Sequence, residues 1–98
     1  MEKKDLDWGN IGFTYMPTDK RYVANYKDGK WSEGVLTSDP NVVINECAGI
    51  LQYCQEIFEG LKAYTTEDGS IVTFRPDLNA ERMMNSAVRL EMPPFPKE

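Results

Sequence analysis

The chain has 98 residues, of which 41% are hydrophobic and 28% charged, and its formal net charge is −5. This length corresponds to one domain or part of one with a modest core, and the composition is that of a soluble globular protein. The acidic net charge argues against nucleic-acid binding. No apolar run approaches the roughly 18 residues that span a bilayer, and the first residues lack the apolar centre of a signal peptide. We therefore expect a cytoplasmic protein.

The chain contains no histidine. This excludes Ser-His-Asp and Cys-His catalysis within these residues and most zinc sites, so we expect no metal site. Cys47 and Cys54 lie seven positions apart, which is neither a C-x-x-C motif nor a dense disulfide scaffold. We therefore expect two buried or half-buried thiols rather than a redox pair.

Residues 1–12 are polar and predict a loose N-terminal segment, whereas 13–98 carry the patterns of an incomplete domain. Aromatic and β-branched residues flank Asp28-Gly29. This dipeptide favours a two-residue turn in which both residues have positive φ. This pattern predicts an antiparallel hairpin over 21–32.

The middle of the chain predicts a loop over 34–43, where turn residues cluster, and a short helix within 45–58. A second hairpin is predicted over 61–75, because two strand-like runs flank Glu67-Asp68-Gly69-Ser70. Together with the helix described next, these elements predict an α+β fold in which antiparallel hairpins form a sheet with one or two packed helices.

Residues 77–90 predict an amphipathic helix that follows Pro76, with Asp77 or Asn79 as its N-terminal cap. Four apolar residues recur at i, i+3, i+7 and i+10 and predict a buried stripe: Ala80, Met83, Ala87 and Leu90. We expect Met83, Ala87 and Leu90 to pack onto the sheet.

A second line on the same helix is polar and holds Asn79, Arg82, Ser86 and Arg89. Guanidinium groups bind phosphate or carboxylate through two parallel hydrogen bonds, so this line can hold a small anion. The alternative is an ordinary solvated helix face. Tyr53 and Phe58 likewise either form a pocket wall or pack in the core. Lys62 is expected to be a solvated lysine and not one that forms a Schiff base.

The segments YCQEIFEGLKAY and FRPDLNAERMMNSAVRL, in this order and separation, resemble the branched-chain amino-acid aminotransferases. These are fold-type IV enzymes that use pyridoxal 5′-phosphate. A weaker match is Phe13-Thr14 with Met16 after Gly12, which is similar to an N-terminal segment of the same family. The matches cover about 40 residues and imply part of the small N-terminal domain of such an enzyme.

The resemblance implies that Arg82 binds the cofactor phosphate and that Tyr53, Phe58 and Phe13 line the pocket for the branched side chain. The parent enzyme would move an amino group between leucine, isoleucine or valine and 2-oxoglutarate. These amino acids and 2-oxo acids would be its partners, and it would be a homodimer. The family's catalytic lysine is expected downstream of residue 98, so the chain alone would be inactive.

Two alternatives remain open from the sequence. The first keeps the fold and changes the substrate, as in a D-amino-acid aminotransferase or an aminodeoxychorismate lyase. The second is a non-catalytic interaction module, which the lack of a lysine suited to covalent cofactor binding would favour.

Overall fold

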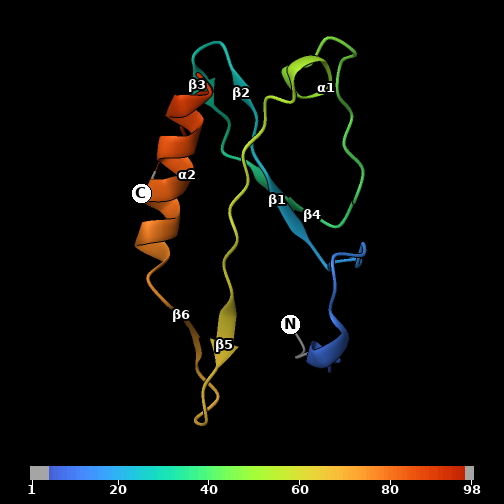
Figure 1. Cartoon of the computed structure of the whole chain (residues 1–98), viewed down its shortest axis with the longest axis vertical. Helices are drawn as coiled ribbons and strands as arrows, with labels where there is room; N and C mark the ends of the chain where they lie inside the picture. Colours follow the sequence, from blue (N-terminus) through green and yellow to red (C-terminus); the bar gives the residue numbers. More distant parts are fainter. Residues whose placement is uncertain (1–4, 97–98) are drawn as a thin grey trace.

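The protein is built from short antiparallel strand pairs and α-helices (Figure 1). The computed structural model describes residues 5–96. In chain order its elements are η1 (Trp8–Asn10), β1 (Arg21–Val23), β2 (Tyr26–Lys27), β3 (Lys30–Trp31), β4 (Val35–Thr37), α1 (Gly49–Tyr53), β5 (Ala63–Thr65), β6 (Ile71–Thr73) and α2 (Pro76–Arg89). The predicted α+β class is therefore confirmed. No helix in the described part of the chain is long and apolar enough to cross a membrane.

The turn between β2 and β3 has the predicted conformation. Asp28 has φ 53° and Gly29 has φ 81°, so both central residues adopt the positive φ that a tight hairpin turn requires. Tyr26 pairs with Trp31 across the ladder, and their rings meet edge to face with centroids 5.3 Å apart. The hairpin predicted from Asp28-Gly29 is therefore confirmed.

The segments that flank the β2–β3 hairpin also pair with each other, in a region where a loop was predicted. β1 pairs with β4, with Val23 opposite Val35, so the prediction of a loop throughout 34–43 is wrong. Between the β2–β3 and β1–β4 ladders the pairing shifts by one residue, and Gly34 lies at this shift with φ 77°. Such a shift is a β-bulge, in which an extra residue bends one strand and pairing then resumes.

The second hairpin is also present, as β5 and β6, with Tyr64 opposite Val72. Its loop is held by short-range hydrogen bonds around Asp68. The Asp68 carboxylate accepts from the Ser70 N–H at 3.0 Å and from the Thr66 hydroxyl. Ordered local bonding of this kind lets a loop longer than two residues close a hairpin.

Helix α1 lies within the predicted range 45–58. It ends at Cys54, which has φ 52° and whose N–H bonds back to the last turn. Both Cys47 and Cys54 are free and exposed, so the expectation of buried thiols is wrong. A five-residue helix has too little surface to cover them, and no residue of α1 is buried.

Helix α2 begins without the predicted side-chain cap. Its N-cap residue is Arg75, in a left-handed backbone conformation with φ 47° and ψ 54°. Pro76 disfavours the right-handed helical conformation at the residue before it, which keeps Arg75 outside the helix. Asp77 instead accepts hydrogen bonds from the Arg75 guanidinium, at 3.0 Å to Nε and 2.7 Å to Nη2. Asn79 bonds to a distant segment, so neither predicted residue caps the helix.

The covered face of α2 differs from the predicted stripe. Ala87 is 3% exposed and is the buried hydrophobic residue of the described chain, whereas Met83 and Leu90 are exposed. The helix lies beside the extended segment that leads into β5, and not on a sheet (Figure 1). Gln55 of that segment donates to the Leu90 carbonyl oxygen at 2.9 Å. The predicted packing of Met83 and Leu90 onto a sheet is therefore wrong.

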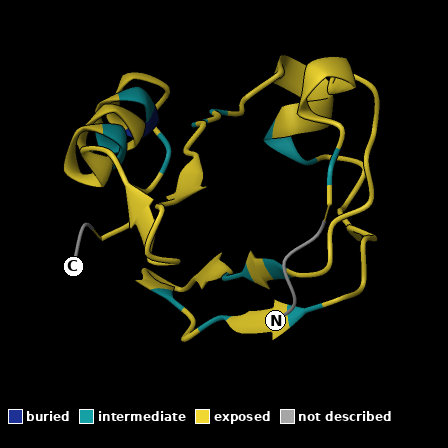
Figure 2. Ribbon diagram, turned by 90° about the horizontal axis from the view of Figure 1, so that it is seen from below, coloured by how far each residue is buried: buried dark blue, intermediate teal, exposed yellow. Residues whose placement is uncertain are grey.

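The described chain has almost no core of its own. Most residues are exposed, as the predominance of yellow in Figure 2 shows. The radius of gyration is 16.1 Å, against roughly 13 Å for a compact domain of about 100 residues. One long-range contact joins the end of the described chain to the first hairpin. Trp31 donates through Nε1 to the Pro94 carbonyl oxygen at 3.1 Å, and its ring lies 4.9 Å from that of Phe95.

Candidate functional site

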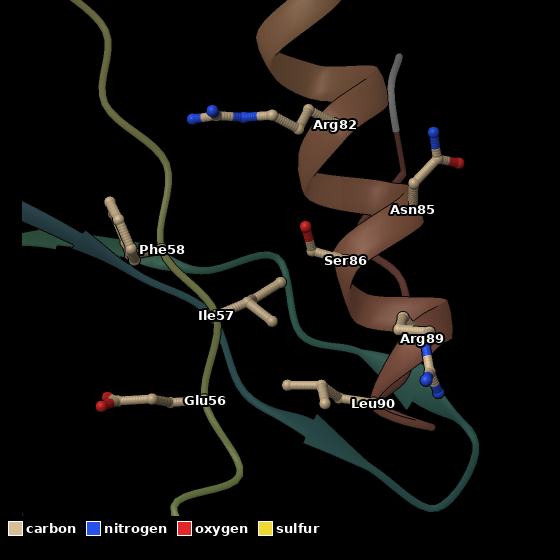
Figure 3. A pocket seen from close by; sticks show the side chains of 8 residues that line it. All are labelled: Glu56, Ile57, Phe58, Arg82, Asn85, Ser86, Arg89 and Leu90. Atoms are coloured by element: carbon tan, nitrogen blue, oxygen red, sulfur yellow. The ribbon is translucent and has the colours of Figure 1, made fainter.

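A groove runs between α2 and the extended segment before β5 (Figure 3). Its volume is about 490 Å³. One wall comes from the extended segment and the other from the helix, and together they present Glu56, Ile57, Phe58, Arg82, Asn85, Ser86, Arg89 and Leu90. Arg82, Ser86 and Arg89 therefore share one side of α2, as their helical spacing predicted.

Arg82 extends from α2 toward the opposite wall and pairs with Glu59. Its Nε donates to Glu59 Oε2 at 2.6 Å, and its Nη2 donates to Oε1. The Glu59 side chain is 11% exposed and that of Arg82 is 65% exposed. The carboxylate is thus covered while the guanidinium remains open to solvent on the groove side.

Glu59 is held by more than Arg82. Asn79 Nδ2 donates to Glu59 Oε1 at 2.8 Å and to the Gly60 carbonyl oxygen at 2.8 Å, and the Gly60 N–H donates to Oε1 at 3.1 Å. The hydrogen bonds from Arg82 are the largest cause that lowers the pKa of Glu59 to about 2, and those from Asn79 and Gly60 add to it. The same pair raises the pKa of Arg82. Glu59 is consequently ionised throughout the neutral range.

The groove contains two of the four residues to which the family resemblance gives a binding role. Phe58 and Arg82 both line it. Tyr53, at the end of α1, and Phe13 are exposed and do not belong to its lining. Tyr53 is 87% exposed and Phe58 is 89% exposed, so neither aromatic packs in a core formed by the described residues.

Sequence reasoning missed Glu59. The residue lies in a segment without regular periodicity, and its partner Arg82 is 23 positions away. The usable signal was on the helix, where Asn79 and Arg82 are three residues apart and so project from one side. Two neighbouring donors on a helix face predict an acceptor opposite them, but they do not identify which carboxylate supplies it.

The groove is suited to a small anion. Arginine has five N–H donors, and the pair with Glu59 uses one on Nε and one on Nη2. Both N–H groups of Nη1 and the second of Nη2 remain for a ligand. Ser86 adds a hydroxyl on the same wall, whereas Arg89 lies about two turns further along α2, too far to share one small anion with Arg82. Arg82 and Ser86 offer donors that fit the oxygens of a phosphate group.

Comparison with known proteins identifies relatives along nearly the whole chain, although no protein-family model matches it. The chain is 57% identical to a branched-chain-amino-acid aminotransferase of Haemophilus influenzae, with 97% of this chain and 28% of the relative covered. It is 45% identical to the enzyme of that name from Helicobacter pylori, with 97% and 28% covered. For branched-chain-amino-acid aminotransferase 5, chloroplastic, of Arabidopsis thaliana the identity is 47%, with 94% and 22% covered.

The chain therefore spans about a quarter of the length of these relatives. The matched regions cover 94–97% of this chain. These 98 residues belong to the branched-chain-amino-acid aminotransferase family.

Proposed function

We propose that this chain supplies a phosphate-binding and substrate-facing part of a branched-chain aminotransferase. The whole protein would transfer an amino group between leucine, isoleucine or valine and 2-oxoglutarate. The observation that carries the proposal is the position of Arg82, which lines a groove with a paired guanidinium and three free N–H donors. The names of the relatives favour this substrate class over a D-amino-acid aminotransferase or an aminodeoxychorismate lyase.

Pyridoxal 5′-phosphate is the proposed cofactor, and it supplies the electron sink for amino-group transfer when bound. Arg82 would hold its phosphate, because an arginine stays charged and offers parallel N–H donors to phosphate oxygens. The Ser86 hydroxyl lines the same wall and can donate to a further oxygen. The role of these residues would be to bind and orient the phosphate end.

Phe58, Tyr53 and Phe13 are proposed to contact the branched side chain of the substrate. All three are exposed in this chain, and Phe58 lines the groove that contains Arg82. Apolar side chains that face an aliphatic substrate gain free energy from the area that both remove from water. Of these three, Phe58 would lie beside the proposed phosphate site, whereas Tyr53 and Phe13 lie outside the lining of the groove.

Covalent binding of the cofactor is assigned to a lysine outside these 98 residues. Lys62 lines two pockets beside β5, and neither contains Arg82. The chain alone is accordingly proposed to be inactive as an aminotransferase. A cytoplasmic location and a homodimeric whole protein remain part of the proposal, and some relatives are named as chloroplastic.

The experiment compares two arginines of one groove in the whole protein. Arg82→Gln should weaken pyridoxal 5′-phosphate binding by at least roughly 2 kcal/mol, the cost of truncating one partner of a desolvated charge pair. Arg89→Gln should have a much smaller effect, because it lies about 10 Å further along the helix axis at about 1.5 Å per residue. Dissociation constants measured side by side at fixed salt provide the test. Equal losses, or a larger loss for Arg89→Gln, would reject the assignment of the phosphate to Arg82.

A further inference from the structure

The carboxylate of Glu59 accepts hydrogen bonds from three residues and joins the extended segment to α2. It accepts hydrogen bonds from Arg82 and Asn79 on α2 and from the backbone N–H of Gly60, all on a side chain that is 11% exposed. We infer that Glu59 is a positioning residue, which orients the Arg82 guanidinium so that its free N–H donors meet a phosphate. This inference rests on the proposed function, because it assigns to Arg82 the binding of the cofactor phosphate.

The geometry of the pair supports a positioning role. Nε and Nη2 form one edge of the planar guanidinium, and both bond to the two oxygens of Glu59. A pair of this kind fixes the plane and the rotation of the guanidinium at once. The edge formed by Nη1 and the second N–H of Nη2 stays free. Without the carboxylate, the long and 65% exposed Arg82 side chain would sample many rotamers.

Asn79 holds the Glu59 carboxylate in one orientation. Its side-chain amide bonds to Glu59 Oε1 and to the Gly60 carbonyl oxygen, each at 2.8 Å. It therefore ties the extended segment to α2 one helical turn before Arg82. Ligand groups that are oriented by such outer partners bind more tightly than free ones, since the outer bonds fix their direction before the ligand arrives.

The opposite effect is also physically possible and makes the inference testable. A carboxylate beside a phosphate repels it, and Glu59 stays ionised at neutral pH because its pKa is lowered to about 2 by Arg82. If this repulsion outweighed the orientation of Arg82, removal of the Glu59 charge would strengthen phosphate binding. The sign of the change therefore separates a positioning residue from a competing anion.

The test measures affinities for pyridoxal 5′-phosphate and for pyridoxal, which lacks the phosphate, in the whole protein. The ratio of the two affinities isolates the contribution of the phosphate. Glu59→Gln is expected to lower this ratio about 10-fold, by analogy with the lower range for loss of an outer partner of a metal ligand. Asn79→Ala is expected to lower it less, and it serves as the second variant if Glu59→Gln does not fold. The matched control is Glu81→Gln, next to Arg82 on α2 but outside the groove.

The outcomes separate this inference from the proposed function. The inference is supported if Arg82→Gln lowers the ratio and if Glu59→Gln or Asn79→Ala lowers it too. Glu81→Gln should leave the ratio unchanged. A ratio lowered by Arg82→Gln alone overturns the positioning role and leaves the proposed function intact. If Glu59→Gln weakens the binding of both ligands equally, Glu59 has a purely structural role. If Glu59→Gln raises the ratio, Glu59 acts as a competing anion. Either result overturns the inference. An unchanged ratio for Arg82→Gln overturns the proposed function itself.

Discussion

Two carboxylates in the part of the chain that the structure describes have their pKa lowered to about 2, and they differ in how far away their partners lie. The pKa of Asp68 is lowered first by the hydrogen bond from the Thr66 hydroxyl and then by the N–H of Ser70, both within two residues of it. The pKa of Glu59 is lowered first by Arg82, 23 residues away. The first effect depends only on the β5–β6 loop, whereas the second requires α2 to lie against the extended segment.

This difference predicts a pH titration that is local to the loop. In the 98-residue chain, Asp68 should titrate near pH 2 instead of at its usual 3.8. A pKa that is lower in the folded loop means that the carboxylate stabilises the loop above pH 3.8, and that this contribution is lost as the pH falls through about 2. Thr66→Val removes the hydroxyl and should raise the pKa of Asp68.

Carbon chemical shifts of the Asp68 side chain, followed by NMR against pH, measure this titration. Arg82→Gln is the control and should leave the Asp68 titration unchanged, because Arg82 makes no contact with the loop. An Asp68 midpoint that does not move in Thr66→Val would contradict the assigned cause.

At the scale of single residues, the sequence was informative where one helix carried the signal. The spacing of Arg82, Ser86 and Arg89 predicted that they share a side of α2, and all three line the groove. Glu59 was missed because its contact with Arg82 joins an irregular segment to a helix. The exposure of Phe58 could not be predicted either, because a segment without periodicity does not indicate which of its side chains are buried.

At the scale of elements, turn chemistry predicted more than strand patterns did. Asp28-Gly29 predicted its own backbone conformation, because few residues adopt positive φ at low cost. The loop predicted from Gly34 onward overlaps strand β4, which the structure shows instead. In fact Gly34 is the residue that lets pairing resume after the bulge, and a glycine within a strand pattern indicates either outcome.

The bulge predicts a specific cost for one methyl group. Gly34→Ala should lower the free energy of unfolding by roughly 1–2 kcal/mol, the cost of a left-handed backbone for a residue with a Cβ atom. A Cβ at this position would also lie 2.3 Å from the Tyr22 hydroxyl oxygen, so that the Tyr22 side chain would have to move. Urea unfolding of the whole protein measures the change.

Gly12→Ala is the matched control for this substitution. No atom lies within 4 Å of a Cβ placed at Gly12, and its φ is outside the left-handed region. Its unfolding midpoint should stay close to that of the unmodified protein. If both variants unfold at the same urea concentration, Gly34 does not carry the strain that the bulge implies.

At the scale of the whole molecule, the chain exposes apolar side chains that a larger domain would cover. Length and composition predicted a modest core, yet large apolar side chains such as Val43, Tyr53 and Phe58 are exposed. The relatives are several times longer than the chain. Periodicity shows which residues share a face, but not whether the covering surface lies within the same 98 residues, so the missing core could not be predicted.

The exposed apolar surface predicts the behaviour of the isolated chain. Its radius of gyration in solution should be at least 16.1 Å, because roughly 13 Å would require a closed core. It should also bind a dye that fluoresces on apolar surfaces, as expanded states with exposed hydrophobic groups do. Small-angle scattering and dye fluorescence measure both properties. A radius near 13 Å without dye binding would mean that the chain closes its own core.

The contact of Trp31 with Pro94 and Phe95 has a consequence for the order of folding. It joins residues 63 positions apart, and closing a flexible loop of that length costs roughly 4 kcal/mol in chain entropy. An edge-to-face ring pair contributes about 0.5–1.5 kcal/mol beyond the burial of its area, and a hydrogen bond contributes about as much. Formation of the β5–β6 hairpin and α2 shortens the loop and lowers its closure cost, so we expect the contact to form after them. Trp31 fluorescence should consequently report the last step of assembly and the first step of unfolding.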